Sequence, residues 1–278
     1  MERLTIANRQ AKLPTGEVIA YYEQGEKRAT GEPVMLLLHG YCGSSAYWQE
    51  VMPHLAESGK IIVPDLRGHG ASTAPRQDVY DMNDYADDIA MLLDELGERQ
   101  AIVLGHSLGG YATLAFAERH PARLRAFGLV HSTALPDAEE AKANRDKAAS
   151  VIREQGIGAF VEGLVPKLFA PSHAEKMADR VEQAKAIGRG TVPEAAIATA
   201  MGMKLRPDRS DVLRDTALPV LLVAGQEDGV VPPQRTLVER AGPAASRALL
   251  EGCGHMSMME RPERLAAELA AFASSVAE

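Results

Sequence analysis

Short runs of apolar residues recur along the chain and alternate with stretches of helical periodicity. The runs are continuous, which is typical of parallel strands buried on both faces of a sheet. One helical stretch carries apolar positions from Tyr85 to Leu96 and stops at Gly97, and another starts at Pro262. The alternation predicts an α/β protein with a mostly parallel, doubly wound sheet. The predicted strands cover 34–38, 61–63, 101–104, 126–130, 220–224 and 248–250.

Two regions depart from this alternation. Residues 18–22 are polar at alternate positions, which predicts an antiparallel edge hairpin with residues 4–8. Between 133 and 209 amphipathic helical stretches follow one another without a strand, with an apolar stripe over 157–169 and a capping box at 191–194 that has proline in the first turn. We expect a helical lid at 133–209, inserted into a core domain of residues 1–132 and 210–278. The alternative is that these helices belong to the core.

Composition narrows the class of protein. The 278 residues are 46% hydrophobic, which is ample for one large core with an insertion. The net charge of -8 and the scattered Lys and Arg argue against nucleic acid as a partner. The chain shows neither a signal peptide nor an apolar stretch of about 18 residues, so no membrane association is expected. Its two cysteines suit a reducing compartment. We expect a cytoplasmic monomer or homodimer with a small-molecule partner.

The segment Gly105-His106-Ser107-Leu108-Gly109 lies between a predicted strand and a predicted helix. This is the context of a nucleophile elbow, in which a serine is raised on a tight strand-to-helix turn. The residues two positions to either side must be small, because the helix doubles back close to the strand, and Gly105 and Gly109 meet that need. The alternative is a glycine-rich loop whose serine only caps the helix.

A serine hydroxyl needs a base to take its proton and a third group to orient that base. Two loops offer them at the carboxyl ends of predicted strands, where ligands bind in parallel sheets. Asp228 follows the strand over 220–224, and His255 follows the strand over 248–250. Alternatives remain for both roles. Asp228 could instead serve only to form an Asx turn. The other candidates are Asp211 and Asp215 for the acid, and His120 and His173 for the base.

Taken in order with His39-Gly40 and the segment 65–72, these motifs resemble the α/β-hydrolase superfamily over nearly the full length of the chain. The likeness is strongest to bacterial carboxylesterases, lactonases and carbon-carbon bond hydrolases with a helical cap. It implies an α/β-hydrolase fold with an eight-stranded sheet and an inserted lid. It also implies that Ser107 is the nucleophile, His255 the base and Asp228 the acid of a catalytic triad.

An oxyanion needs two hydrogen-bond donors. The backbone N–H of Leu108 opens a helix and suits one of them, and the resemblance assigns the other to the N–H of Tyr41. Cys42 could line the pocket or be a small buried thiol, and His39 and His106 could instead be packing residues. Met256 belongs to a flexible apolar cluster that could shape an acyl pocket or fill the core. The candidate pocket residues are His39, Gly40, Cys42, His106 and Met256.

We therefore expect a carboxylesterase that hydrolyses small to medium carboxylic esters through an acyl-enzyme, with no cofactor and no metal. A carbon-carbon bond hydrolase or a lactonase, such as an enol-lactonase, would use the same three residues. A non-catalytic ligand receptor on the same fold is the alternative from another class. A buried substrate carboxylate needs Arg or Lys partners. The apolar lid stripe therefore favours esters over diketone or keto-acid substrates.

Overall fold

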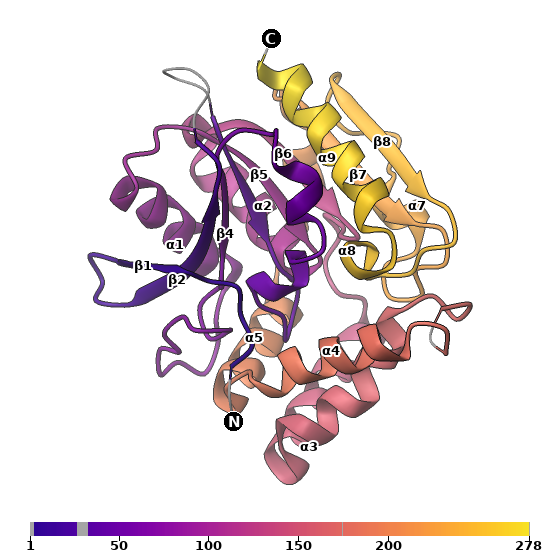
Figure 1. Ribbon diagram of the computed structural model, residues 1–278. Coiled ribbons are helices and arrows are strands. Elements are labelled where there is room, and N and C mark those ends of the chain that lie inside the picture. The colour runs from indigo at the N-terminus through magenta and orange to yellow at the C-terminus, as the bar shows by residue number, and fades with distance from the viewer. Residues whose placement is uncertain (1–2, 27–32, 174, 278) are drawn as a thin grey trace.

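One sheet of eight strands forms the centre of the described protein, with helices on both faces (Figure 1). The computed structural model describes residues 3–26, 33–173 and 175–277. The strand order is β1-β2-β4-β3-β5-β6-β7-β8, in which β1 and β2 run antiparallel to their neighbours and the remaining pairs are parallel. The predicted eight-stranded, mostly parallel sheet is confirmed. The strands are β1 (Arg9–Lys12), β2 (Val18–Gln24), β3 (Val34–Leu38), β4 (Ile61–Pro64), β5 (Ala101–His106), β6 (Leu124–Val130), β7 (Val220–Gly225) and β8 (Ala245–Leu250).

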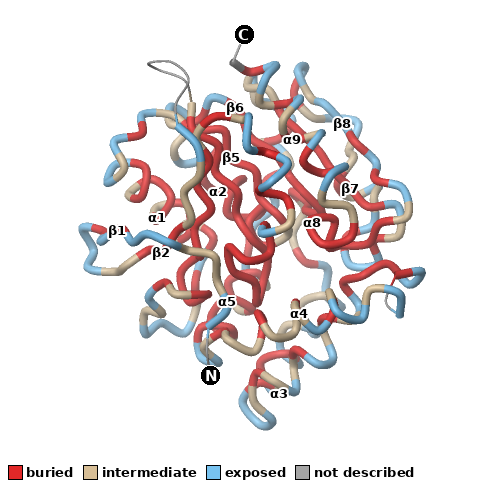
Figure 2. The backbone as a smooth tube through the Cα atoms, viewed as in Figure 1, coloured by how far each residue is buried: buried red, intermediate tan, exposed pale blue. Residues whose placement is uncertain are grey.

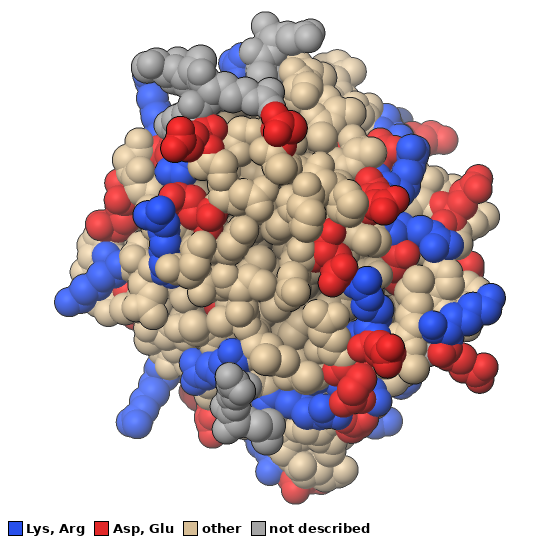
Figure 3. Space-filling view, viewed as in Figure 1, with Lys and Arg blue, Asp and Glu red and all other residues tan. Residues whose placement is uncertain are grey.

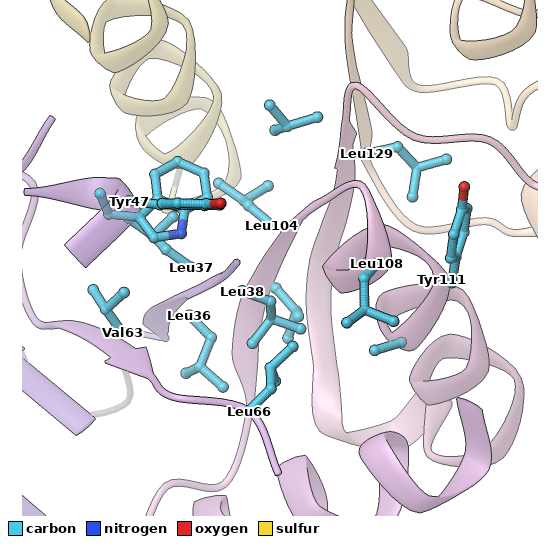
Figure 4. Close-up of a cluster of buried hydrophobic side chains, with 14 of the residues drawn as sticks. Leu36, Leu37, Leu38, Tyr47, Val63, Leu66, Leu104, Leu108, Tyr111 and Leu129 are labelled. Carbon is cyan, nitrogen blue, oxygen red and sulfur yellow. The ribbon is translucent and has the colours of Figure 1, made fainter. Parts of the chain in front are cut away.

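The central strands are buried along their whole length, as their continuous apolar runs predict. Every residue of β3, β5 and β7 is buried, and the buried backbone gathers in the middle of Figure 2. Leucines of β3 pack against Leu104 and Leu108 in the same core (Figure 4). The elbow serine therefore follows a strand at the centre of the buried core.

Helices α1, α2 and α6 pack together along one side of the sheet, whereas α8 and α9 pack with the short 3-10 helices η1 and η2 on the other. The predicted helix that ends at Gly97 and the predicted helix that starts at Pro262 are both present. The described helices outside the 133–209 segment are η1 (Ser45–Trp48), η2 (Met52–Leu55), α1 (Met82–Glu95), α2 (Leu108–Arg119), η3 (Pro121–Arg123), α6 (Ser210–Asp215), α7 (Pro233–Thr236), α8 (Ser257–Glu260) and α9 (Pro262–Ala277).

The edge hairpin forms with a different partner from the one predicted. Strand β2 pairs with Arg9–Lys12 and not with residues 4–8. Within the earlier segment, the Asn8 N–H still donates to the Tyr21 carbonyl of β2 at 3.0 Å. The residues before Asn8 are held by side chains, because the Thr5 hydroxyl donates to Asp65 at 2.7 Å and the Ile6 N–H donates to the Ser45 hydroxyl at 3.2 Å. Alternating polarity therefore located the hairpin but not its outer strand.

Helices α3 (Glu139–Leu164), η4 (Val165–Leu168), α4 (Ala178–Arg189) and α5 (Pro193–Leu205) lie between β6 and β7. They gather below the sheet in Figure 1, and α3 packs against both α4 and α5. Gly156 breaks α3, with a φ of 83°. The predicted capping box at 191–194 is wrong, since the N-cap of α5 is Val192 and no side chain caps it, although Pro193 does open the helix. These helices lie within the segment 133–209 for which a lid is predicted, and we refer to them as the lid.

Charged side chains of both signs are interspersed on the face shown in Figure 3. Among the described residues, no helix is both long enough and apolar enough to cross a membrane.

Candidate active site

Ser107 occupies the turn between β5 and α2 in a strained backbone conformation. Its φ of 51° and ψ of -112° lie where side chains other than glycine are rare. A Cβ atom on Gly105 would overlap the carbonyl of Gly109, and one on Gly110 would overlap the Ser132 hydroxyl. The Ser107 side chain is partly exposed, although the residues on both sides of it are buried. The local sequence therefore folds into a tight turn that presents a hydroxyl.

His255 and Asp228 lie against each other at the carboxyl ends of β8 and β7. His255 Nδ1 is 2.8 Å from Asp228 Oδ2, and both side chains are buried. A carboxylate can only accept, so Nδ1 carries the proton and Nε2 keeps its lone pair. Burial acts to raise the pKa of Asp228, but the His255 and His131 imidazoles hold that pKa well below its usual range. Asp228 is therefore a carboxylate beside a correctly oriented imidazole.

The other oxygen of Asp228 fixes the position of the carboxylate. Oδ1 accepts the backbone N–H groups of Val230 and Val231, each at 2.8 Å. These bonds leave Oδ2 to face the imidazoles, so the loop after β7 sets which oxygen meets His255.

The serine and the imidazole approach the same place, but no hydrogen bond joins the Ser107 hydroxyl to His255 within the described residues. The connection runs through the neighbouring His106, whose Nε2 donates to the His255 carbonyl at 2.9 Å and whose ring centroid lies 4.9 Å from that of His255. Bonds between a nucleophile and its base are often long in a free enzyme and tighten when substrate binds. The base loop is thus anchored directly to the elbow.

Two backbone N–H groups beside Ser107 have no partner in the described part of the chain. They belong to Tyr41 and Leu108, both of which are buried. Leu108 is the first residue of α2, where the helix dipole favours negative charge. Gly40 brings the Tyr41 loop close, since a Cβ atom on Gly40 would lie 3.3 Å from Ser107 Cβ. Two free donors near a raised hydroxyl can stabilise an oxyanion.

His131 is a residue of the site that the sequence analysis missed. It follows β6 directly, and its Nδ1 lies 3.1 Å from Asp228 Oδ2 while its Nε2 lies 2.7 Å from the Ser257 hydroxyl. Its φ of 50° is again left-handed. The available signal was its position, because it follows an apolar strand just as Asp228 follows β7.

The atoms of His131, Asp228 and His255 also lie within 4.8 Å of one another, a spacing that could suit a metal ion. Two of these contacts are hydrogen bonds to the same carboxylate oxygen. That bonding accounts for the closeness without an ion.

Glu260, in α8, holds the base loop against the lid. Its Oε1 accepts the N–H groups of Gly254 and Met256 at 3.0 and 3.2 Å, and its Oε2 accepts the Ala170 N–H at 2.9 Å.

Two further contacts tie the base loop to the residues after α3. Oε2 of Glu260 also lies 3.0 Å from Nδ1 of His173, and the His255 N–H donates to the Leu168 carbonyl at 2.7 Å. The position of the base therefore depends on residues that follow α3.

Most of the predicted pocket residues are buried and already bonded. His39 Nδ1 donates to the Gly40 carbonyl and Nε2 accepts the Leu66 N–H, and burial lowers the His39 pKa to about 4. Burial likewise raises the Cys42 pKa to about 12, so this thiol is not reactive. Met256 and His106, which adjoin His255 and Ser107 in the sequence, are also buried. A Cβ atom on Gly40 would lie 3.3 Å from Ser107 Cβ, so the Gly40 backbone can line a pocket beside the serine.

The rival residues lie elsewhere. Asp215 is exposed on α6 and pairs with Arg214, whereas Asp211 is exposed at the start of that helix. His120 pairs with Asp87 at 2.8 Å, and His173 pairs with Glu260. None of these four side chains contacts His255 or Asp228 among the described hydrogen bonds.

Comparison with known proteins extends this picture. A 2-(acetamidomethylene)succinate hydrolase from Mesorhizobium japonicum is 33% identical over 206 residues, which are 72% of this chain and 72% of that protein. An esterase from Thermogutta terrifontis, solved with malate bound, is 30% identical with a TM-score of 0.90, covering 97% of this chain and 100% of that one. An enol-lactonase from Burkholderia xenovorans, at 22% identity, shares the fold with a TM-score of 0.87 over 96% of this chain and 100% of its own.

A family profile described as the alpha/beta hydrolase fold matches residues 33–262, which is most of the chain. The protein therefore belongs to the α/β-hydrolase fold family and is a hydrolase.

Proposed function

We propose that this hydrolase is a carboxylesterase that uses Ser107, His255 and Asp228 to cleave small to medium carboxylic esters through an acyl-enzyme. The observation that carries the proposal is the 2.8 Å hydrogen bond from His255 to Asp228, at the same sheet edge as the strained Ser107 elbow. The unpartnered N–H groups of Tyr41 and Leu108 support it further. An esterase at 30% identity, similar over nearly the whole of both chains, adds support for this substrate class.

The proposed reaction has two halves. The Ser107 oxygen attacks the ester carbonyl while His255 Nε2 takes the hydroxyl proton, and the Tyr41 and Leu108 N–H groups stabilise the oxyanion. When the intermediate collapses, His255 returns the proton to the departing alcohol, which leaves an acyl group on Ser107. Water then attacks the acyl-enzyme with His255 as base, releasing the acid and restoring the serine. Asp228 stabilises the imidazolium in both halves.

A panel of p-nitrophenyl esters from acetate to octanoate tests this function. We expect turnover by the wild-type protein and a fall of about 10⁵-fold or more in kcat for Ser107→Ala, because the nucleophile is lost. Ser150→Ala alters an exposed serine on α3 and should leave turnover unchanged. A fluorophosphonate should label wild-type protein at one site per chain and should not label Ser107→Ala.

Several outcomes would contradict the proposal. Full activity in Ser107→Ala would exclude this serine as nucleophile. Neither turnover nor labelling of the wild-type protein would favour a ligand receptor. Labelling without ester turnover, followed by cleavage of a lactone or of a carbon-carbon bond in a diketone, would favour the two alternative hydrolase activities.

A further inference from the structure

A charged cluster lies inside the lid, where the sequence predicted only an apolar stripe. Asp137 precedes α3 and accepts from Nε of Arg145 at 3.0 Å and from Nη1 of Arg206 at 2.6 Å. The Asp137 and Arg206 side chains are only 5% and 4% exposed. Two guanidinium groups therefore share one carboxylate, which leaves a net positive charge in this cluster. Buried charge of this kind calls for an anionic partner.

The guanidinium group of Arg206 is held by contacts within the protein. Besides Asp137, it donates to the carbonyl groups of Met203 and Leu135, and its guanidinium lies 3.9 Å from the ring centroid of Tyr111. These contacts make it a structural residue that fixes the position of Asp137.

Arg145 differs from Arg206 in its unused hydrogen-bond donors. Only its Nε is bonded, and its two terminal amino groups donate to no group within the described residues, although a quarter of the side chain is accessible. Burial acts to lower the Arg145 pKa, but Tyr111, Asp137 and Tyr41 raise it above its usual value, so the charge persists. The free side of this guanidinium is thus available to a ligand.

The contacts of the cluster link Arg145 to helix α2, because Asp137 joins Arg145 to Arg206, whose guanidinium lies against the Tyr111 ring. Tyr111 lies on α2 four residues after Ser107 and one turn from Leu108 (Figure 4). Tyr41 belongs to the loop with the second free N–H, and its hydroxyl donates to the Ala196 carbonyl of α5 at 2.9 Å. The cluster that contains Arg145 therefore lies against the helix whose first residue, Leu108, would hold the oxyanion.

We propose that Arg145 binds a free carboxylate of the substrate, so that the preferred substrates are esters that carry a carboxylate, such as half-esters of short dicarboxylic acids. This inference rests on the proposed function, whose substrate class it specifies. Two parallel N–H groups of a guanidinium match the two oxygens of a carboxylate. The apolar stripe begins after the break at Gly156, whereas Arg145 lies in the first half of α3. The lid interior thus offers both an apolar wall and an anion anchor.

The test compares monoethyl succinate, which carries one free carboxylate, with ethyl butyrate, which carries none. For Arg145→Gln we expect kcat/KM for monoethyl succinate to fall about tenfold to a hundredfold, chiefly through KM, because charge-assisted bonds to the substrate are lost. The value for ethyl butyrate should stay within about twofold. The substitution leaves Asp137 paired with Arg206, so the fold should persist. Arg153→Gln changes an exposed arginine on the same helix and should alter neither value.

A binding measurement separates this inference from the esterase proposal. Calorimetry in the Ser107→Ala background should detect succinate binding that Arg145→Gln abolishes and Arg153→Gln preserves. The anion site would be overturned if Arg145→Gln lost kcat/KM equally on both esters or lost none on monoethyl succinate. Succinate binding that is unchanged in Arg145→Gln would overturn it as well. If succinate binding depends on Arg145 but the wild-type protein cleaves neither ester, the anion site stands and the proposed esterase activity fails.

Discussion

At the scale of single residues, Asp228 has two oxygens with different tasks. Oδ1 is fixed by the N–H groups of Val230 and Val231, and Oδ2 is shared by His131 and His255. The position of Asp228 after a strand could be predicted from the sequence, because apolar strands and the loops after them are local features. The second imidazole could not, since His131 is 97 residues away and reaches Asp228 only through the packing of β6 beside β7.

Asp228→Asn should lower kcat for ester hydrolysis by about 10⁴-fold. The amide oxygen will remain with the two backbone N–H groups, so the amide nitrogen must face His255 Nδ1. His255 Nδ1 must then accept from the amide N–H, which moves the imidazole proton to Nε2 and removes the base. Asp215→Asn, on an exposed residue, should keep wild-type kcat. If Asp228→Asn kept more than a tenth of the activity, the acid would have to be sought elsewhere.

At the scale of elements, close approach of the elbow turn requires glycine. Gly105→Ala should lower the free energy of unfolding by several kcal/mol and abolish activity, because the new methyl group meets the Gly109 carbonyl across the turn. Gly163→Ala, where a Cβ atom would meet nothing within 4 Å on α3, should instead raise stability by about 0.5–1 kcal/mol. Urea unfolding of both variants checks the pair. Equal stability of Gly105→Ala and wild type would show that the turn is looser than described.

The elements also show how far sequence patterns reach. Continuous apolar runs located β3 to β7, because burial on both faces leaves a signal in each of these strands. Of the edge strand β8, which has exposed residues, only the last three residues were predicted. The outer strand of the hairpin and the cap of α5 were misassigned, since side-chain bonds from Asp65 and Ser45 and the packing of the lid override local preference there. Asp137, Arg145 and Arg206 come together only when the lid folds, so their spacing along the sequence does not predict the cluster.

At the scale of the whole molecule, buried neutral histidines make stability depend on pH. Burial lowers the pKa of His39 to about 4 and that of His69 to about 3, and it also lowers the pKa of His106 and His131. Unfolded histidines take up a proton near pH 6.5, so as the pH falls the unfolded chain binds protons first. The stability is therefore fully present above about pH 6.5 and is lost progressively toward pH 4 and below.

His39→Gln measures this effect. The glutamine oxygen can still accept the Leu66 N–H, but the side chain no longer titrates. Between pH 7.5 and 5, the unfolding free energy of the wild-type protein should fall by about 2 kcal/mol more than that of His39→Gln. The exposed His54→Gln should match the wild type in urea titrations at both pH values. A pH slope that is the same in all three proteins would rule out His39 as a contributor.

The bonds of Glu260 to the base loop and to Ala170 restrict how the segment before α4 can move. The segment that precedes α4 helps to hold His255 through Leu168 and Ala170, so it cannot swing outward as a hinged flap without loosening the general base. Exchanging caps between relatives would therefore fail at this junction unless the graft kept these backbone contacts.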